Sequence, residues 1–241
     1  AAALLSATGS IRVASGIANV YVRDAIATKA AATTLAELYD GRFELGLGVS
    51  NNVGNSLRGH DWLPPLVKLD SFFTAMDDAR LAIRYEHKVP VYLAAHGPKL
   101  MDFAARRADG ANTYLMTTQY TQRAREILGP DKRLIVMQQC LVSESSEQAR
   151  SIARKAIHIY LQLENYHRAW SAQGFSQADY ADGGSDRLVD AIVAWGSTTT
   201  VRARIDEHRA AGADQVVVIP INADNGALPD WHLLEALTDH A

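Results

Sequence analysis

Cysteine, surplus positive charge and long apolar runs are scarce in this chain of 241 residues, and each scarcity excludes a class of protein. The single cysteine, Cys140, rules out an internal disulfide, and its apolar surroundings predict a core residue rather than a nucleophile. With 24 Lys+Arg against 27 Asp+Glu, the net charge is −3 and gives no basic field for nucleic acid. No apolar run approaches the roughly 18 residues of a membrane span. We therefore expect a cytoplasmic protein without nucleic-acid or membrane partners.

Several common catalytic motifs are also missing. The chain has no GxxxxGK[ST] phosphate loop, no HExxH zinc motif and no GxSxG nucleophile elbow. Gly46-Leu-Gly48 lacks the third glycine of a dinucleotide fingerprint. Glu164 and His167 have the spacing of half a di-iron site, but the second copy is missing, so they predict a solvated helix face. We predict no metal site.

Strand-like and helix-like segments alternate along the chain, which is long enough for one α/β domain over residues 1–241. Similar helix-to-strand turns at 105–115 and 209–219 are typical of βα units in a parallel sheet. The predicted strands are 11–18, 43–50, 90–96, 110–115, 134–142 and 215–221. The predicted helices are 1–8, 24–40, 65–84, 98–108, 119–128, 146–170, 185–195, 198–211 and 228–238.

Helix boundaries follow from particular residues. Asp24 is expected to cap the helix that follows it, and Gly41 to take a left-handed conformation just after that helix ends. Pro64 and Pro65 are expected to open the next helix. The segment from Asp182 to Asp186 is expected to cap the helix through Leu188–Trp195.

The number of strands leaves two architectures open. Six parallel strands with crossover helices fit an open doubly wound sheet or a closed (β/α)8 barrel that is two strands short. The chain begins without methionine, inside a helix-like segment. The strand at 11–18 would expose an unpaired edge, so we expect an upstream strand–helix–strand portion that this sequence does not contain.

Three strand ends are candidate ligand sites, because ligands of α/β proteins meet the chain at the carboxyl ends of strands. In GRFELGLGVS (41–50), Gly46 and Gly48 remove side chains just before a polar loop, although a strand with two packing glycines is the structural alternative. In ASGIANVY (14–21), Ser15 and Gly16 bring the backbone close to a ligand, although a bulge glycine is the structural alternative. His60, in the loop after residue 50, is either a surface residue or within reach of the site.

The third strand end lies in PVYLAAHGPKLMDFAARRADG, residues 90–110. Gly97 would permit an unusual backbone angle, and Pro98 would start a helix whose free amides form an anion site. Lys99 adds positive charge, and His96 lies at the end of the strand. The alternative is an ordinary βα turn with a solvated lysine.

Taken together, these segments resemble the coenzyme F420-dependent oxidoreductases of the bacterial luciferase-like superfamily. The resemblance covers nearly the whole chain in order and implies an α/β fold, a (β/α)8 TIM barrel, in a protein that acts on a small-molecule substrate and commonly forms a homodimer. Its segments are SIRVASGIANVY, TLAELYDGRFELGLGVS, PPLVKLDSFFTAMD, VPVYLAAHGPKLMDFAARRADGANTYL, GSDRLVDAIVAWG and AGADQVVVIPI.

The resemblance also implies a set of cofactor-binding residues. The tricyclic ring would lie against a non-prolyl cis peptide, at either Ser15–Gly16 or Gly16–Ile17. The cofactor-binding residues would be Ser15, Gly16, Ile17, Gly48, Val49, Ser50, Asn51, Asn52, Ala95, His96, Gly97, Pro98, Lys99, Tyr114, Leu115 and Thr117, with Ala95–Lys99 on the phosphate.

One departure from the family pattern leaves the catalytic residue unassigned. Some sugar-phosphate-oxidising relatives carry a glutamate where this chain has Val49 or Ser50, so we do not expect that substrate class. The expected reaction is hydride transfer between F420 and an alcohol, carbonyl compound or enone. An FMN-dependent monooxygenase and a non-catalytic cofactor-binding barrel remain alternatives.

Overall fold

The computed structural model describes residues 1–82, 84–224, 226 and 228–238, and within it the chain forms two compact units. The first unit comprises residues 1–112 and the second residues 113–241. The strand pairs described in both units are parallel, as the alternation of strands and helices predicts. Among the described residues, no helix combines the length and apolar composition that a membrane crossing requires.

In the first unit, β3 is the strand that organises the sheet. Both β1 and β2 pair with β3, β3 pairs with β4, and β4 pairs with the first residues of β5. The elements are α1 (Ala2–Ser6), β1 (Val13–Ala14), β2 (Ala18–Asn19), α2 (Ala25–Leu38), β3 (Phe43–Gly48), α3 (Asn52–Ser56), α4 (Pro65–Asp78), β4 (Val91–Ala94), α5 (Pro98–Arg107) and β5 (Gly110–Tyr114).

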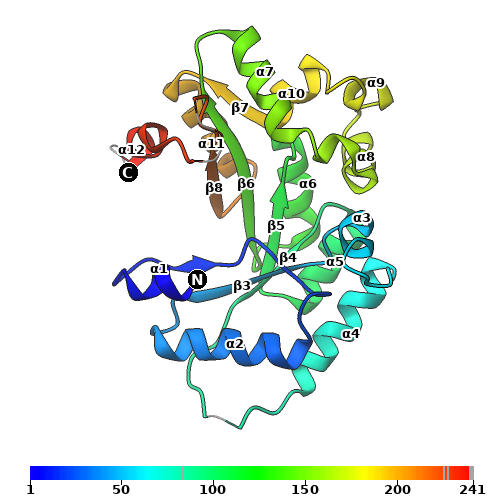
Figure 1. Ribbon diagram of the computed structural model, residues 1–241, viewed down its shortest axis with the longest axis vertical. Helices are drawn as coiled ribbons and strands as arrows, with labels where there is room; N and C mark the ends of the chain where they lie inside the picture. Colours follow the sequence, from blue (N-terminus) through cyan, green and yellow to red (C-terminus); the bar gives the residue numbers. More distant parts are fainter. Residues whose placement is uncertain (83, 225, 227, 239–241) are drawn as a thin grey trace. The chain divides into compact units, whose positions relative to one another are not determined.

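The residues of β3 are all buried, which is typical of a parallel strand covered on both faces. Helix α2 packs against β3 and α4 (Figure 1). As predicted, α2 begins where the Asp24 carboxylate accepts a hydrogen bond from the amide of Ala27 at 2.8 Å. Gly41 follows α2 with φ +70°, the left-handed conformation expected of it.

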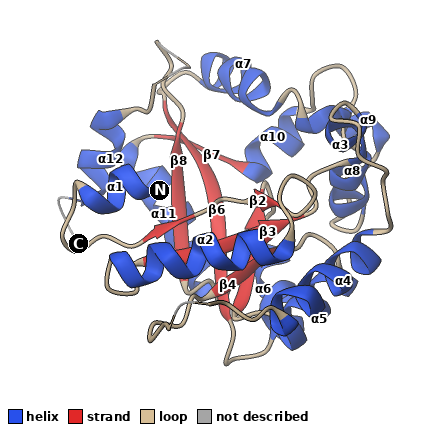
Figure 2. Ribbon diagram, turned by 60° about the horizontal axis from the view of Figure 1, so that its bottom comes forward, coloured by secondary structure: helices blue, strands red, loops and turns tan. Residues whose placement is uncertain are grey.

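In the second unit, β6 is the long central strand and pairs with both β7 and β8. Helices α7 and α10 pack against β7 and against each other, as Figure 2 shows. The elements are α6 (Thr118–Leu128), β6 (Arg133–Val142), α7 (Ser146–Ile157), the 3₁₀ turn η1 (Tyr160–Gln162), α8 (Glu164–Ser171), α9 (Gln177–Tyr180), α10 (Asp186–Ile192), β7 (Val193–Gly196), α11 (Thr198–Ala210), β8 (Gln215–Pro220) and α12 (Trp231–Thr238).

Several predicted helices were wrong in extent. The helix predicted over 185–195 ends at Ile192, and Val193–Gly196 form a strand because they pair with β6. The helix predicted over 146–170 is divided by the 3₁₀ turn η1. The helix opened by Pro65 ends at Asp78 rather than residue 84, and Ile83 lies outside the described residues. No strand was predicted at 193–196.

Candidate functional site

The ends of β1 and β3 are joined by Ser15 and Gly46. The Ser15 hydroxyl donates to the carbonyl of Gly46 at 2.9 Å and accepts from its amide at 3.0 Å. A Cβ atom on Gly46 would lie 2.0 Å from the Ser15 carbonyl oxygen, so only glycine fits there. The peptide bond between Gly16 and Ile17, just after Ser15, is cis. This confirms one of the two positions that the family resemblance implied.

Gly48 brings the three predicted strand ends together. In the register of β2 and β3, Gly48 lies opposite Asn19. A Cβ atom on Gly48 would lie 2.8 Å from the Ile17 Cδ1 atom and 3.2 Å from the Ala94 Cβ atom. The segments 15–17, 48–52 and 95–99 therefore gather at the carboxyl ends of neighbouring strands, where α/β proteins bind ligands.

The polar loop after β3 is held by Asn55, a residue that the sequence analysis did not single out. Its side-chain amide donates to the carbonyls of Val49 at 2.7 Å and Asn51 at 3.0 Å, and its Oδ1 atom accepts from Asn19 at 2.8 Å. Ser50 has φ +60°, an uncommon conformation for a residue other than glycine. These contacts fix the main chain of the loop next to the strand ends.

Two asparagine side chains of this loop are engaged within it. Asn51 caps α3 by accepting from the amide of Gly54 at 2.7 Å. Asn52 accepts from the hydroxyl of Ser56 at 3.1 Å. The loop therefore presents chiefly its backbone to a ligand.

The N-terminus of α5 follows directly on β4. Gly97 is the N-cap residue, no side chain caps the helix, and Pro98 occupies the first turn. Helix geometry leaves the amides of Lys99 and Leu100 without intrahelical acceptors, and the positive end of the helix dipole adds to the attraction for an anion.

Two residues lie beside this helix end, and one of them differs from its sequence-based description. Gly97 has φ −119°, ordinary extended backbone, so the expectation that it supplies an unusual angle was wrong. A Cβ atom there would meet nothing within 4 Å. Burial lowers the pKa of His96 to about 4, so its ring is neutral at pH 7. Positive charge at this helix end therefore comes from the exposed Lys99.

Three predicted site residues, Tyr114, Leu115 and Thr117, belong to the second unit. The Thr117 hydroxyl donates to Gln173 Oε1 at 2.8 Å and accepts from the Tyr120 amide at 3.1 Å. The indole of Trp170 donates to the carbonyl of Leu115 at 2.9 Å, and Leu115 has φ +56°. The region around α8 thus fixes the backbone that follows β5.

Three further residues named from the sequence lie among the following neighbours. Cys140 is fully buried, as predicted. His167 stacks on Tyr180, with ring centroids 4.1 Å apart. The ring of His60 lies 5.9 Å from that of Tyr21.

The start of α5 in the first unit fits the phosphate of a cofactor, because it offers uncapped amides for an anion. The space beside Gly46 and Gly48 is filled by Ser15, Ile17 and Ala94, so these glycines let the strand ends pack closely rather than leave room for a ring. The assignment of these residues to a cofactor stays a prediction.

The sequence model of the luciferase-like monooxygenase family matches residues 1–63 and 67–215. The chain belongs to this family. Two curated relatives are 5,10-methylenetetrahydromethanopterin reductases. The protein of Methanolobus tindarius is 23% identical over 253 residues, which cover 87% of this chain and 77% of the relative. The protein of Archaeoglobus fulgidus is 24% identical over 264 residues, which cover 90% of this chain and 79% of the relative.

Two solved enzyme structures have the same fold. An F420-dependent secondary alcohol dehydrogenase in complex with an F420–acetone adduct has a TM-score of 0.71 at 15% identity, over 99% of this chain and 83% of that one. The oxygenating constituent of 3,6-diketocamphane monooxygenase of Pseudomonas putida, in complex with FMN, has a TM-score of 0.71 at 13% identity, over 99% and 80%. The predicted luciferase-like (β/α)8 fold class is therefore confirmed, and these relatives are enzymes.

Proposed function

We propose that this protein is an oxidoreductase that transfers a hydride between coenzyme F420 and a small organic substrate of the alcohol, carbonyl or enone type. The main support is the gathering of Gly16–Ile17, Gly48 and the uncapped start of α5 at neighbouring strand ends. The known activities of similar proteins also support the proposal. One protein of the same fold is an F420-dependent secondary alcohol dehydrogenase, and two curated relatives are 5,10-methylenetetrahydromethanopterin reductases.

In this proposal the chain binds and orients the cofactor mainly through its backbone. Gly46 and Gly48 let the strand ends that carry the site pack closely together, and the first-turn amides of α5 bind the phosphate together with Lys99. The neutral ring of His96 contributes hydrogen bonding rather than charge. When bound, F420 supplies a carbon that carries hydride, where a flavin has a nitrogen that reacts with oxygen.

The cellular setting belongs to the same proposal. We infer a cytoplasmic enzyme that works as a homodimer on a small-molecule substrate, without nucleic-acid or membrane partners. Gel filtration with light scattering measures the oligomeric state, and a monomeric mass would contradict the dimer without affecting the cofactor assignment.

An FMN-dependent monooxygenase is the second candidate. The family is described as luciferase-like monooxygenases, and one structure of the same fold is a complex with FMN. Both cofactors carry a ring and a phosphate, so the same backbone binding site suits either one.

Fluorescence titration with each cofactor separates the two candidates. We expect F420 to bind at micromolar concentration and more tightly than FMN, and stopped-flow mixing with alcohols, aldehydes and enones to change the F420 absorbance. Binding of FMN alone would overturn the proposal in favour of the monooxygenase. Binding of F420 without turnover of any compound would favour a non-catalytic cofactor-binding barrel.

A further inference from the structure

Two adjacent glutamines in the interior of β6 differ in how their side chains are satisfied. Gln138 is 2% exposed and Gln139 is 5% exposed. Successive side chains of a strand point to opposite faces, so the two amides lie on opposite sides of β6. They form a matched pair, with the same chemistry and burial but different partners.

Gln138 has every hydrogen-bonding group paired. Its amide nitrogen donates to the carbonyls of Gln139 at 2.9 Å and Ile192 at 3.0 Å. Its Oε1 atom lies 2.9 Å from Nε2 of the fully buried His208, which α11 contributes. Gln138 therefore faces the helices that cover the sheet and has a structural role.

Gln139 has one half of its amide unpaired. Its Nε2 atom donates to the Tyr114 hydroxyl at 2.7 Å. Its Oε1 atom is buried and has no hydrogen-bond partner among the described residues. Leaving a buried acceptor unpaired costs free energy, and buried amides in folded proteins are rarely left in this state. A ligand that brings a donor would remove this cost.

Tyr114 is the hydrogen-bond partner of the Gln139 amide nitrogen. Burial and the neighbouring Tyr160 hydroxyl raise its pKa well above the ordinary value, so the phenol keeps its proton at any physiological pH. The hydroxyl accepts from Gln139 and is also hydrogen-bonded to the Tyr160 side chain. Tyr114 thus holds the Gln139 amide in place, and the unpaired group of the pair is Gln139 Oε1.

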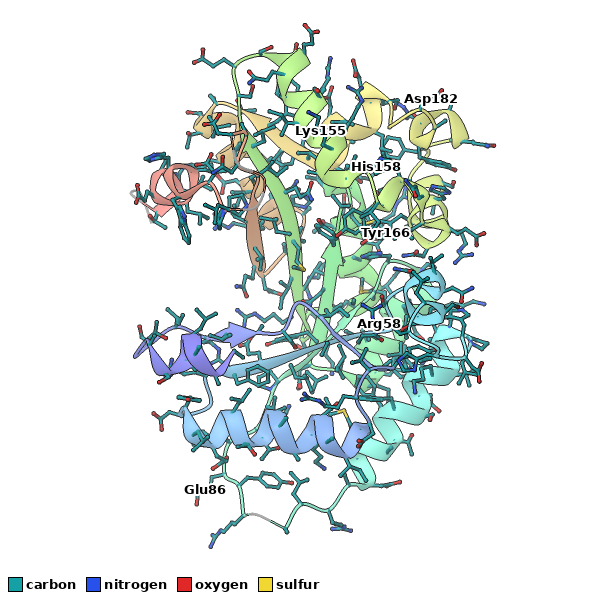
Figure 3. All side chains as sticks on the ribbon, in the orientation of Figure 1. Arg58, Glu86, Lys155, His158, Tyr166 and Asp182 are labelled. Carbon is teal, nitrogen blue, oxygen red and sulfur yellow. The ribbon has the colours of Figure 1, made fainter. Side chains whose placement is uncertain are left out.

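The surroundings of this pair are aromatic. The ring of Tyr160 packs edge-on against Tyr114 at 5.2 Å between centroids, and Tyr166 packs against Tyr160 at 5.1 Å. Tyr166, which α8 contributes, is labelled in Figure 3. Tyr114 is the last residue of β5, and Gln139 lies three residues before the end of β6. The pair therefore lies near the strand ends where ligands bind in this fold.

We propose that Gln139 and Tyr114 form a substrate-binding subsite that recognises an alcohol hydroxyl, an inference that rests on the proposed function. The substrate O–H donates to Gln139 Oε1, and Tyr114 holds the Gln139 amide in place. A hydroxyl satisfies this acceptor, whereas a hydrocarbon does not. The aromatic rings favour an apolar body next to that hydroxyl, so the substrate class is an apolar alcohol.

The first test compares the ligand-free stability of Gln139→Met and Gln138→Met by thermal unfolding. Gln139→Met removes an unpaired acceptor together with one hydrogen bond, so we expect a melting temperature within about 2 °C of the unmodified protein. Gln138→Met removes the hydrogen bonds of Gln138 to His208 Nε2 and to the Ile192 carbonyl, so we expect a loss of roughly 5 °C or more. An equal loss in both variants would make Gln139 structural and overturn the proposal.

The second test measures F420 affinity and steady-state kinetics with 2-propanol and cyclohexanol. For Gln139→Met we expect unchanged F420 affinity and a loss of roughly tenfold in kcat/KM, mostly through KM. Tyr114→Phe should behave in the same way. Unchanged kcat/KM would overturn the proposal, and so would a parallel loss of F420 affinity, because the pair would then contact the cofactor ring.

The two tests separate this inference from the proposed function. If the unmodified protein neither binds F420 nor oxidises alcohols, the proposed function fails and this assignment of the subsite to a substrate fails with it. If the unmodified protein turns alcohols over and Gln139→Met does so equally well, only the subsite fails.

Discussion

Gly46 and Gly97 both lie at strand ends of the first unit, but they have different surroundings. A Cβ atom on Gly46 would lie 2.0 Å from the Ser15 carbonyl oxygen, which is backbone and cannot rotate away. We expect Gly46→Ala to lower the free energy of unfolding by about 1–3 kcal/mol, the usual cost of overpacking, because β1 must move away from β3. Urea unfolding followed by circular dichroism measures this change.

Gly97→Ser is the matched control for Gly46→Ala. The serine side chain would meet no atom within 4 Å at its Cβ, and the extended backbone of Gly97 suits an N-cap residue. Serine caps helices slightly better than glycine, so stability should stay the same or rise by a few tenths of a kcal/mol. Equal stability of Gly46→Ala and the unmodified protein would contradict the close approach of the two strands.

At the scale of elements, the uncapped start of α5 makes a prediction about cofactor affinity. Gly97→Asp places a carboxylate that can cap the helix, so it accepts from the same amides that are proposed to bind phosphate. We expect the fold to be retained and F420 affinity to fall by roughly 100-fold or more, through lost hydrogen bonds and like-charge repulsion. Fluorescence titration measures the affinity, and circular dichroism checks the fold.

Gly97→Asn separates capping from charge, because asparagine has nearly the same size and caps equally well. It should weaken F420 binding less than Gly97→Asp does. Identical affinities of the two variants would exclude a role for charge. If Gly97→Asp bound F420 with full affinity, the proposal that the phosphate binds at the start of α5 would be wrong.

Sequence patterns predicted the elements whose ends depend on local chemistry. Helix α2 starts at Asp24 because a carboxylate can pair with an amide three residues later, and it is followed by Gly41 because glycine tolerates positive φ. Strand β7 was missed because Val193 follows Ile192 without a helix-breaking residue. Its strand conformation depends on pairing with β6, about 50 residues earlier in the chain, and no local pattern records that contact.

The candidate site was predictable to the extent that glycines mark it. Gly16, Gly46 and Gly48 indicated close backbone approach, and the structure brings all three segments together. Asn55 and Gln139 were missed. Asn55 pairs with Asn19, which is distant in the sequence, and Gln139 stands out through an acceptor that has no partner among the described residues. The two glutamines in the apolar run LIVMQQCLV were the available signal, since buried amides are uncommon in strand interiors.

At the scale of the whole molecule, two histidines link stability to pH. The amide nitrogen of Gln138 donates to two carbonyls, so its Oε1 atom accepts, and His208 carries its proton on Nε2. The other ring nitrogen, Nδ1, accepts from the Thr121 hydroxyl at 2.9 Å. Burial, with a contribution from Arg204, lowers the pKa of His208 to about 4. Burial lowers the pKa of His96 to the same value.

The sign of the pH effect follows from these lowered pKa values. In the unfolded chain a histidine has a pKa of about 6.5, so the unfolded state takes up protons first as pH falls. The stabilisation from each neutral ring is complete above pH 6.5 and is lost as pH falls towards 4. At pH 5 each ring accounts for a loss of about 2 kcal/mol in the free energy of unfolding.

His208→Gln should therefore flatten the pH dependence of stability. Glutamine does not titrate in this range, so the loss of unfolding free energy between pH 7 and pH 5 should shrink by about 2 kcal/mol, while stability at pH 7 falls through poorer packing. Urea unfolding at both pH values measures the difference. His158→Gln is the control, because His158 is exposed at the end of α7 and is labelled in Figure 3. If the stability of His208→Gln depended on pH as steeply as that of the unmodified protein, the lowered pKa of His208 would be contradicted. An equally reduced pH dependence in both variants would contradict it too.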